Sequence, residues 1–150
     1  MPRLRVETFI QAPREKCFDL ARDIDVHLQT TGSSSEKAVA GVTTGKMELH
    51  DFVTFEAKHF GIKQRLTSEI VEYDRPHFFV DQMVKGPFKR LRHEHRFEAR
   101  DGGTLMIDFM DFSSPLGPLG WCVDKFALAT YMARFLAERG KCLKEIAERT

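Results

Sequence analysis

From residue 36 to residue 113, turn signals divide the chain into short segments whose apolar side chains alternate along the sequence. The signals fall at 43–48, 60–61, 74–76, 86–87 and 101–103. Alternation with a period of two is typical of strands with one buried face, and short turns join antiparallel neighbours. A long segment near 119–149 follows, with apolar residues spaced by three and four. That spacing predicts one amphipathic helix.

These patterns predict an antiparallel sheet that wraps around one C-terminal helix. Residues 3–11 alternate as a further strand, Pro13 precedes a short helical stripe, and a second short helix is expected near 25–30. A lone helix that follows a sheet most simply buries its stripe on that sheet. We therefore predict an α+β fold with a curved sheet of six or seven strands, two short helices after the first strand, and a single domain spanning residues 1–150.

Composition and charge exclude several classes of protein. The net charge of +1 gives no field that favours nucleic acid, and no segment approaches the roughly 20 apolar residues of a membrane span. The three cysteines are far apart and form no CxxC motif, and the N-terminus has no signal-peptide apolar run. We expect a cytoplasmic protein without nucleic-acid partners or an integral membrane segment, and an oligomer is possible but not indicated.

The segment 91–97 places two histidines on an apolar strand face. His93 and His95 share the face of Leu91 and Phe97, and charged residues alternate with them. Polar groups on the concave face of a sheet that grips a helix predict a small-molecule cavity. The turns at 60–61, 86–87 and 113–120 fall at one end of the sheet. The polar residues expected to enter the cavity near that end are His59, Gln64, Gln82, His93, His95 and Asp108. The facing of Asp108 stays open, because 104–112 is apolar on both faces.

This polar group has several interpretations. It can orient a largely apolar ligand, or form a buried network that satisfies its own hydrogen bonds. Alternatively, His93 or His95 can serve as an acid or base with Asp108 as its orienting partner. In a third alternative, His59 and Asp108 complete a metal site with the two histidines, but a His-x-His strand without a demonstrated third ligand is a weak signal. We predict no metal and no cofactor.

Apolar residues near the same end complete the candidate site. Phe88 and Leu116 lie in turns, and Phe126, Ala129 and Ala133 lie on the helical stripe. The small residues on this stripe either allow a close approach to the sheet or leave volume open beneath the helix. The turn residues are interpreted as packed loops, as a lid over the cavity, or as a contact surface for a membrane or partner.

A set of motifs spread over the chain resembles the START and pollen-allergen-like (SRPBCC) superfamily. They are His59-Phe60-Gly61, Phe79-Val80-Asp81-Gln82, Gly86-Pro87-Phe88, His93-Glu94-His95-Arg96-Phe97, Gly102-Gly103-Thr104 and Pro115-Leu116-Gly117-Pro118-Leu119-Gly120. The sequence looks most like bacterial members described as polyketide cyclase/dehydrase-like or ligand-binding. The resemblance implies a helix-grip fold with a hydrophobic cavity between sheet and helix. It does not imply a reaction.

Three functions follow as expectations. The first is binding or carriage of a small hydrophobic molecule such as a lipid, an isoprenoid or an aromatic polyketide. The second is a cyclase or dehydratase acting on such a molecule, with His93, His95 and Asp108 as candidate catalytic residues. The third is a regulatory or assembly role through the apolar loops.

Overall fold

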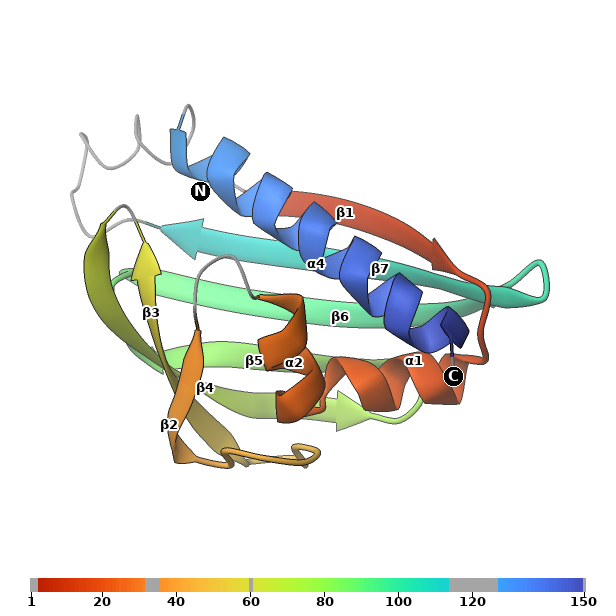
Figure 1. The fold of residues 1–150 in the computed structure, drawn as a ribbon, viewed down its shortest axis with the longest axis horizontal. Coiled ribbons are helices and arrows are strands. Elements are labelled where there is room, and N and C mark those ends of the chain that lie inside the picture. Colours follow the sequence, from red (N-terminus) through yellow and green to blue (C-terminus); the bar gives the residue numbers. More distant parts are fainter. Residues whose placement is uncertain (1–2, 32–35, 60, 114–126, 150) are drawn as a thin grey trace.

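The computed structural model describes residues 3–31, 36–59, 61–113 and 127–149, with only the backbone of His59 included. The chain begins with a strand, continues through two short helices and six further strands, and finishes with a long helix (Figure 1). This order confirms the predicted one. The elements are β1 (Arg3–Ile10), α1 (Arg14–Ala21), α2 (Ile24–Thr30), β2 (Lys37–Gly41), β3 (Phe52–His59), β4 (Ile62–Asp74), β5 (Phe78–Lys85), β6 (Arg90–Arg100), β7 (Gly103–Ser113) and α4 (Ala129–Arg149). The predicted helix start near residue 119 lies outside the described residues.

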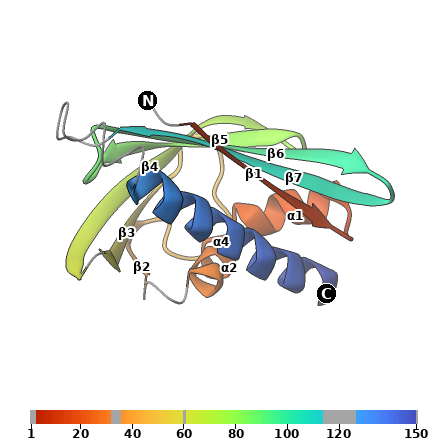
Figure 2. The ribbon, with the colours of Figure 1, turned by 90° about the horizontal axis from the view of Figure 1, so that it is seen from above.

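All seven strands form one antiparallel sheet in the order β1-β7-β6-β5-β4-β3-β2. β2 to β7 form a continuous meander, and β1 pairs with β7 as the edge strand on that side of the sheet. The sheet curls, and the helices lie on its concave side, with α4 crossing it diagonally (Figures 1 and 2). This is the predicted helix-grip architecture.

The short helices cover one end of the concave face. The side chain of Asp23 caps α2 by accepting hydrogen bonds from the backbone N–H groups of Asp25 and Val26. In α1, the ring of Phe18 is fully buried and meets Tyr73, Phe79 and Phe97 edge to face. This aromatic cluster fills the space beneath α1 with a solid core, so any open volume under the sheet must lie elsewhere.

The long helix α4 approaches the sheet closely at β1. A Cβ atom at Gly140 would collide with Oγ1 of Thr8 and come within 3.7 Å of Met106. On the same helix, Leu136, Leu143 and Ala147 are buried. The close approach fixes the height of α4 above the β1 edge of the sheet.

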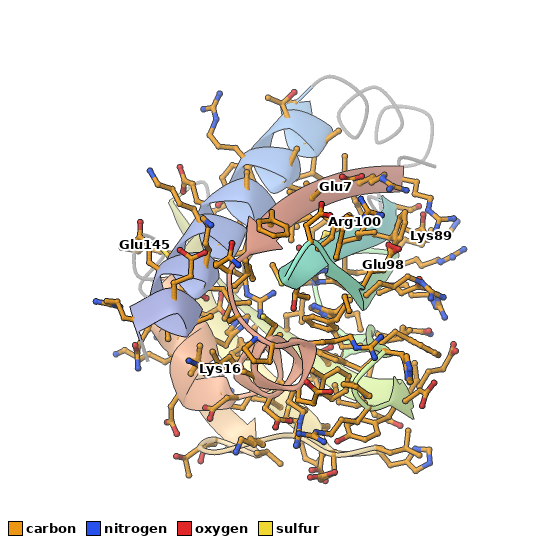
Figure 3. The ribbon with its side chains drawn as sticks, turned by 90° about the vertical axis from the view of Figure 1, so that its right-hand side faces the viewer. Glu7, Lys16, Lys89, Glu98, Arg100 and Glu145 are labelled. Atoms are coloured by element: carbon orange, nitrogen blue, oxygen red, sulfur yellow. The ribbon has the colours of Figure 1, made fainter. Side chains whose placement is uncertain are left out.

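The outer surface carries charges of both signs. Figure 3 shows Glu7 of β1, Glu98 and Arg100 of β6 and Glu145 of α4 on the outside of their elements, and all four are exposed. Glu98 and Arg100 form an ion pair of 3.6 Å. Among the described residues, no helix is long and apolar enough to cross a bilayer.

Candidate functional site

A cavity of about 420 Å³ lies between the concave face of the sheet and α4. This volume falls within the range of small-molecule sites. The sheet, the two short helices and α4 all contribute to its wall. Its apolar lining includes Met47, Val53, Phe55, Ala57, Leu66, Ile70, Phe79, Phe88, Leu91, Met110, Leu128, Met132, Phe135 and Leu136.

Four titratable side chains from three neighbouring strands meet at the sheet side of this cavity. Antiparallel pairing sets Asp81 of β5 opposite His93 of β6, and His95 opposite Asp108 of β7. Directly opposite residues share a face of the sheet. The register therefore gathers both histidines and both carboxylates on the concave face. We call these four residues the His/Asp cluster.

The His/Asp cluster is tightly hydrogen-bonded. Nε2 of His93 lies 2.8 Å from Oδ1 of Asp108, and Nε2 of His95 lies 2.6 Å from Oδ2 of Asp81. The two imidazole rings stack with centroids 3.7 Å apart. Ser68 of β4 donates its hydroxyl to Oδ1 of Asp81 at 3.0 Å. His93, His95 and Asp108 are all buried.

The surroundings give the two histidines different proton affinities. Burial, followed by the neighbouring charge of His95, lowers the pKa of His93. Burial also acts to lower the pKa of His95, but contacts with Asp108 and Asp81 outweigh it and raise that pKa. Burial acts to raise the pKa of both carboxyl groups, yet their contacts with the histidines hold each pKa well below the usual range. His95 is therefore the more basic member of the pair.

This charge pattern determines the tautomer of His93. The Asp108 carboxylate is deprotonated, so it can only accept, and Nε2 of His93 carries the hydrogen that it receives. Nδ1 of His93 then keeps a lone pair. A histidine of lowered pKa beside one of raised pKa is an arrangement suited to moving a proton.

Asp81, His93 and His95 also place one potential metal-ligand atom each within 4.8 Å of one another. A histidine must be neutral to bind a metal ion. In the structure Nε2 of His95 is engaged by Oδ2 of Asp81 at 2.6 Å, and Nδ1 lies 3.5 Å from Oδ1 of Asp108. A metal ion bound here would have to replace the hydrogen bond between His95 and Asp81.

A second polar group lines the cavity from the helices and the segment before β2. His27 of α2 lies 2.6 Å from Oε1 of Glu36 and stacks on Phe55. Arg22 and Arg139 also line the cavity, and both are buried. The wall thus carries charge on the helix side as well as on the sheet side.

The predicted site residues divide into three groups. Gln64, Phe88, His93 and His95 line the cavity, and Asp108 lies against His93. Three predicted residues do not line the cavity, namely Gln82, Ala129 and Ala133. Outside the described part of the chain are Leu116, Phe126 and the side chain of His59.

The placement of Gln82 corrects the facing predicted for β5. Gln82 is exposed, and Asp81 and Phe79 line the cavity instead. Residues 78–85 have apolar side chains in both alternating sets, so period-two counting could not choose between them. The pairing with β6 decides the facing, because Asp81 must share the face of His93.

The long helix packs on the sheet as predicted, but the ligand contacts expected from Ala129 and Ala133 need correction. The small residues of the stripe do not border the cavity, and Gly140 packs against β1. The cavity is lined by the adjacent, bulkier side of α4 and the residue before it, which contribute Leu128, Tyr131, Met132, Phe135, Leu136 and Arg139.

Sequence reasoning missed Asp81, Ser68, Glu36, His27 and Arg139 as wall residues. For Asp81 a signal was present in the hairpin centred on Pro87. Asp81 and His93 lie at equal distances from Pro87 along the chain and are paired in the sheet. No local pattern distinguishes Arg139 from the other charged residues of its helix.

Comparisons with known proteins agree with this architecture. The family model described as "Polyketide cyclase / dehydrase and lipid transport" matches residues 1–148. No curated protein matches the chain.

The fold is shared with solved structures of low sequence identity. TTHA0849 from Thermus thermophilus has a TM-score of 0.78 at 21% identity, covering 96% of this chain and 95% of that chain. The Zhui aromatase/cyclase from Streptomyces sp. R1128 has a TM-score of 0.79 at 14% identity, covering 99% and 94%. Ginseng major latex-like protein 151 from Panax ginseng has a TM-score of 0.70 at 15% identity, covering 97% of each chain.

The family description names both cyclase or dehydrase chemistry and lipid transport. The match covers nearly the whole chain and coincides with a helix-grip fold. The chain belongs to the polyketide cyclase/dehydrase and lipid transport family.

Proposed function

We propose that residues 1–150 act as one domain that binds or carries a small hydrophobic molecule in the cavity beneath α4. The observation that carries this proposal is the cavity of about 420 Å³ with a mainly apolar wall and a few buried polar groups. Burial of apolar ligand surface supplies the affinity, and the polar groups fix the orientation of the ligand.

The test uses N-phenyl-1-naphthylamine, an uncharged aromatic probe whose fluorescence rises in apolar surroundings. Saturable binding is expected in the parent protein. Ala57→Trp should abolish it, because Ala57 lines the cavity and an indole there occupies the ligand volume. Ala137→Trp is the matched control, since Ala137 is on the exposed side of α4.

Melting temperatures separate a filled cavity from a damaged core. Lost probe binding by a folded Ala57→Trp variant, with binding kept by Ala137→Trp, supports the proposal. If the parent binds no probe, or if both variants bind it as tightly as the parent does, the cavity is not a binding site. Overpacking of a solid core by Ala57→Trp would instead cost roughly 1–3 kcal/mol of stability.

A second function, an enzyme of the cyclase or dehydratase type, is favoured by the His/Asp cluster itself. Such reactions begin when a base takes a proton from a carbon beside a carbonyl group. His93 is suited to this step through Nδ1, and Asp108 orients its ring through the bond to Nε2. Both histidines line the cavity.

Hydrogen–deuterium exchange at C1 of 2-tetralone in D₂O tests for this base. We expect the protein to accelerate the exchange. As the pH increases, the rate should rise and reach its plateau before pH 6.5, because the pKa of His93 is lowered from 6.5. His93→Gln should remove the acceleration, whereas the exposed His50→Gln should keep it. Equal rates with the parent and with His93→Gln would assign the cluster to binding alone.

A further inference from the structure

Arg139 is a buried cation in the cavity wall with few partners. Its residue is 7% exposed, and it lines the cavity from α4. One Nη2–H donates to the carbonyl oxygen of Ala21 at 3.3 Å, and the buried Nε has no hydrogen-bond partner. Among the described residues, no carboxylate oxygen lies within 4.0 Å of the guanidinium.

Arg22, the other buried arginine of this wall, has a guanidinium group with several hydrogen-bond and ion-pair partners. It lies 2.9 Å from Asp19 and 3.0 Å from Glu48, and it also donates to the backbone oxygen of Met47. Arg22 thus has two carboxylate partners, and its burial needs no further explanation.

The nearby acid Glu36 is already bonded to another side chain. Its Oε1 lies 2.6 Å from Nε2 of His27, and its side chain is only 8% exposed. Burial lowers the pKa of His27, so this imidazole is neutral and donates its N–H to the carboxylate. Arg139 remains as a cation that is removed from water and has no paired anion, which is an expensive arrangement.

We propose that Arg139 binds the charged end of the cavity ligand, and that the ligand is a small apolar molecule bearing one anionic oxygen group such as a carboxylate. This inference rests on the proposed binding function and names its ligand class. The planar guanidinium matches an oxyanion with parallel N–H donors, and such pairs are strong where water is excluded.

The His/Asp cluster gives the ligand a direction. Both carboxyl groups are deprotonated and at most one of the two histidines carries a balancing proton, so the cluster is net negative. An anionic group would be repelled there and attracted to Arg139. The uncharged part of the ligand therefore faces the His/Asp cluster.

Two probes with the same aromatic skeleton test this assignment. 8-Anilino-1-naphthalenesulfonate carries one anionic group, whereas N-phenyl-1-naphthylamine carries none. Arg139→Met should weaken sulfonate binding roughly ten- to hundredfold, the size of one charged hydrogen-bonding contact. It should leave the affinity for the neutral probe unchanged. Arg139→Lys should fall between the parent and Arg139→Met for the sulfonate.

Arg134→Met is the matched control, because Arg134 is exposed on the same helix and does not line the cavity. It should change neither affinity. Arg139→Met should melt no lower than this control, since it removes an unpaired buried charge. If Arg139→Met fails to fold, Arg139→Gln and Arg139→Lys carry the comparison.

The outcomes separate the two proposals. If the parent binds neither probe, the binding function itself fails. If the parent binds both probes and Arg139→Met affects both equally or neither, the cavity binds ligands but the anion assignment is overturned. Selective loss of the sulfonate in Arg139→Met, with Arg134→Met unchanged, supports the assignment.

Discussion

Asp108 is the residue on which the buried cluster depends. Its Oδ1 lies 2.8 Å from Nε2 of His93 and 3.5 Å from Nδ1 of His95, so one carboxylate faces both rings. It is buried in the sheet with Met106 and Met110 as its neighbours on the same strand face. A carboxylate in this position is stable only while the histidines supply hydrogens and charge.

Asp108→Asn should lower the unfolding free energy at neutral pH by about 3–5 kcal/mol, because it breaks a buried ion pair. The folded-state pKa of Asp108 is depressed, so its stabilisation is present above pH 3.8 and is lost as the pH falls below that value. The parent should therefore lose stability more steeply in acid than the variant, by up to about 1.4 kcal/mol per pH unit.

Urea unfolding at a series of pH values from neutral to acid measures this difference. Asp111→Asn is the control. Asp111 is on the same strand, and its ion pair with the exposed Arg3 is long, at 3.9 Å. Parallel curves for the parent and Asp108→Asn would show that Asp108 is not held as a buried carboxylate.

At the scale of elements, prediction succeeded where one face of a strand was clearly apolar. In β6, charged residues alternate with Leu91, His93, His95 and Phe97, and the structure confirms that facing. In β5 both faces contain apolar residues, and Val80 is fully buried on the face opposite to Asp81. Local alternation carries no information in that case. The partner strand determines which side chain reaches the cavity.

The helix α4 shows a similar limit. Periodicity correctly predicted an amphipathic helix packed on the sheet, but a stripe does not say which of its edges meets β1 and which faces an open volume. That choice depends on the tight contact between Gly140 and Thr8.

Gly140→Ala tests that contact. Alanine favours a helix over glycine by about 1 kcal/mol, but its methyl group would collide with Oγ1 of Thr8. Overpacking of roughly 1–3 kcal/mol should outweigh the propensity gain, so we expect a net loss of stability. Thr8→Ala in the same chain should restore part of it. A variant as stable as or more stable than the parent would contradict this account of how α4 is seated.

At the scale of the whole molecule, a packed core and an open cavity lie under the same sheet. The core is built around Phe18 beneath α1, and the cavity lies beneath α4. The order of elements, the antiparallel sheet and the gripped helix could all be predicted, because they follow from periodicity and turns. The helix-side charges of the cavity could not. Arg139 and Glu36 reach the same cavity wall only through tertiary folding.

The proposed function requires that the cavity take up a small hydrophobic molecule. Methyl NMR of the protein labelled at its methionine methyl groups measures this directly during titration with N-phenyl-1-naphthylamine. Met47, Met110 and Met132 line the cavity, whereas Met83 and Met106 do not. Binding in the cavity predicts large, saturable shifts of the three cavity methyl signals and contacts between them and the aromatic ring. Shifts confined to Met83 and Met106, or no saturable shift of the cavity signals, would contradict it.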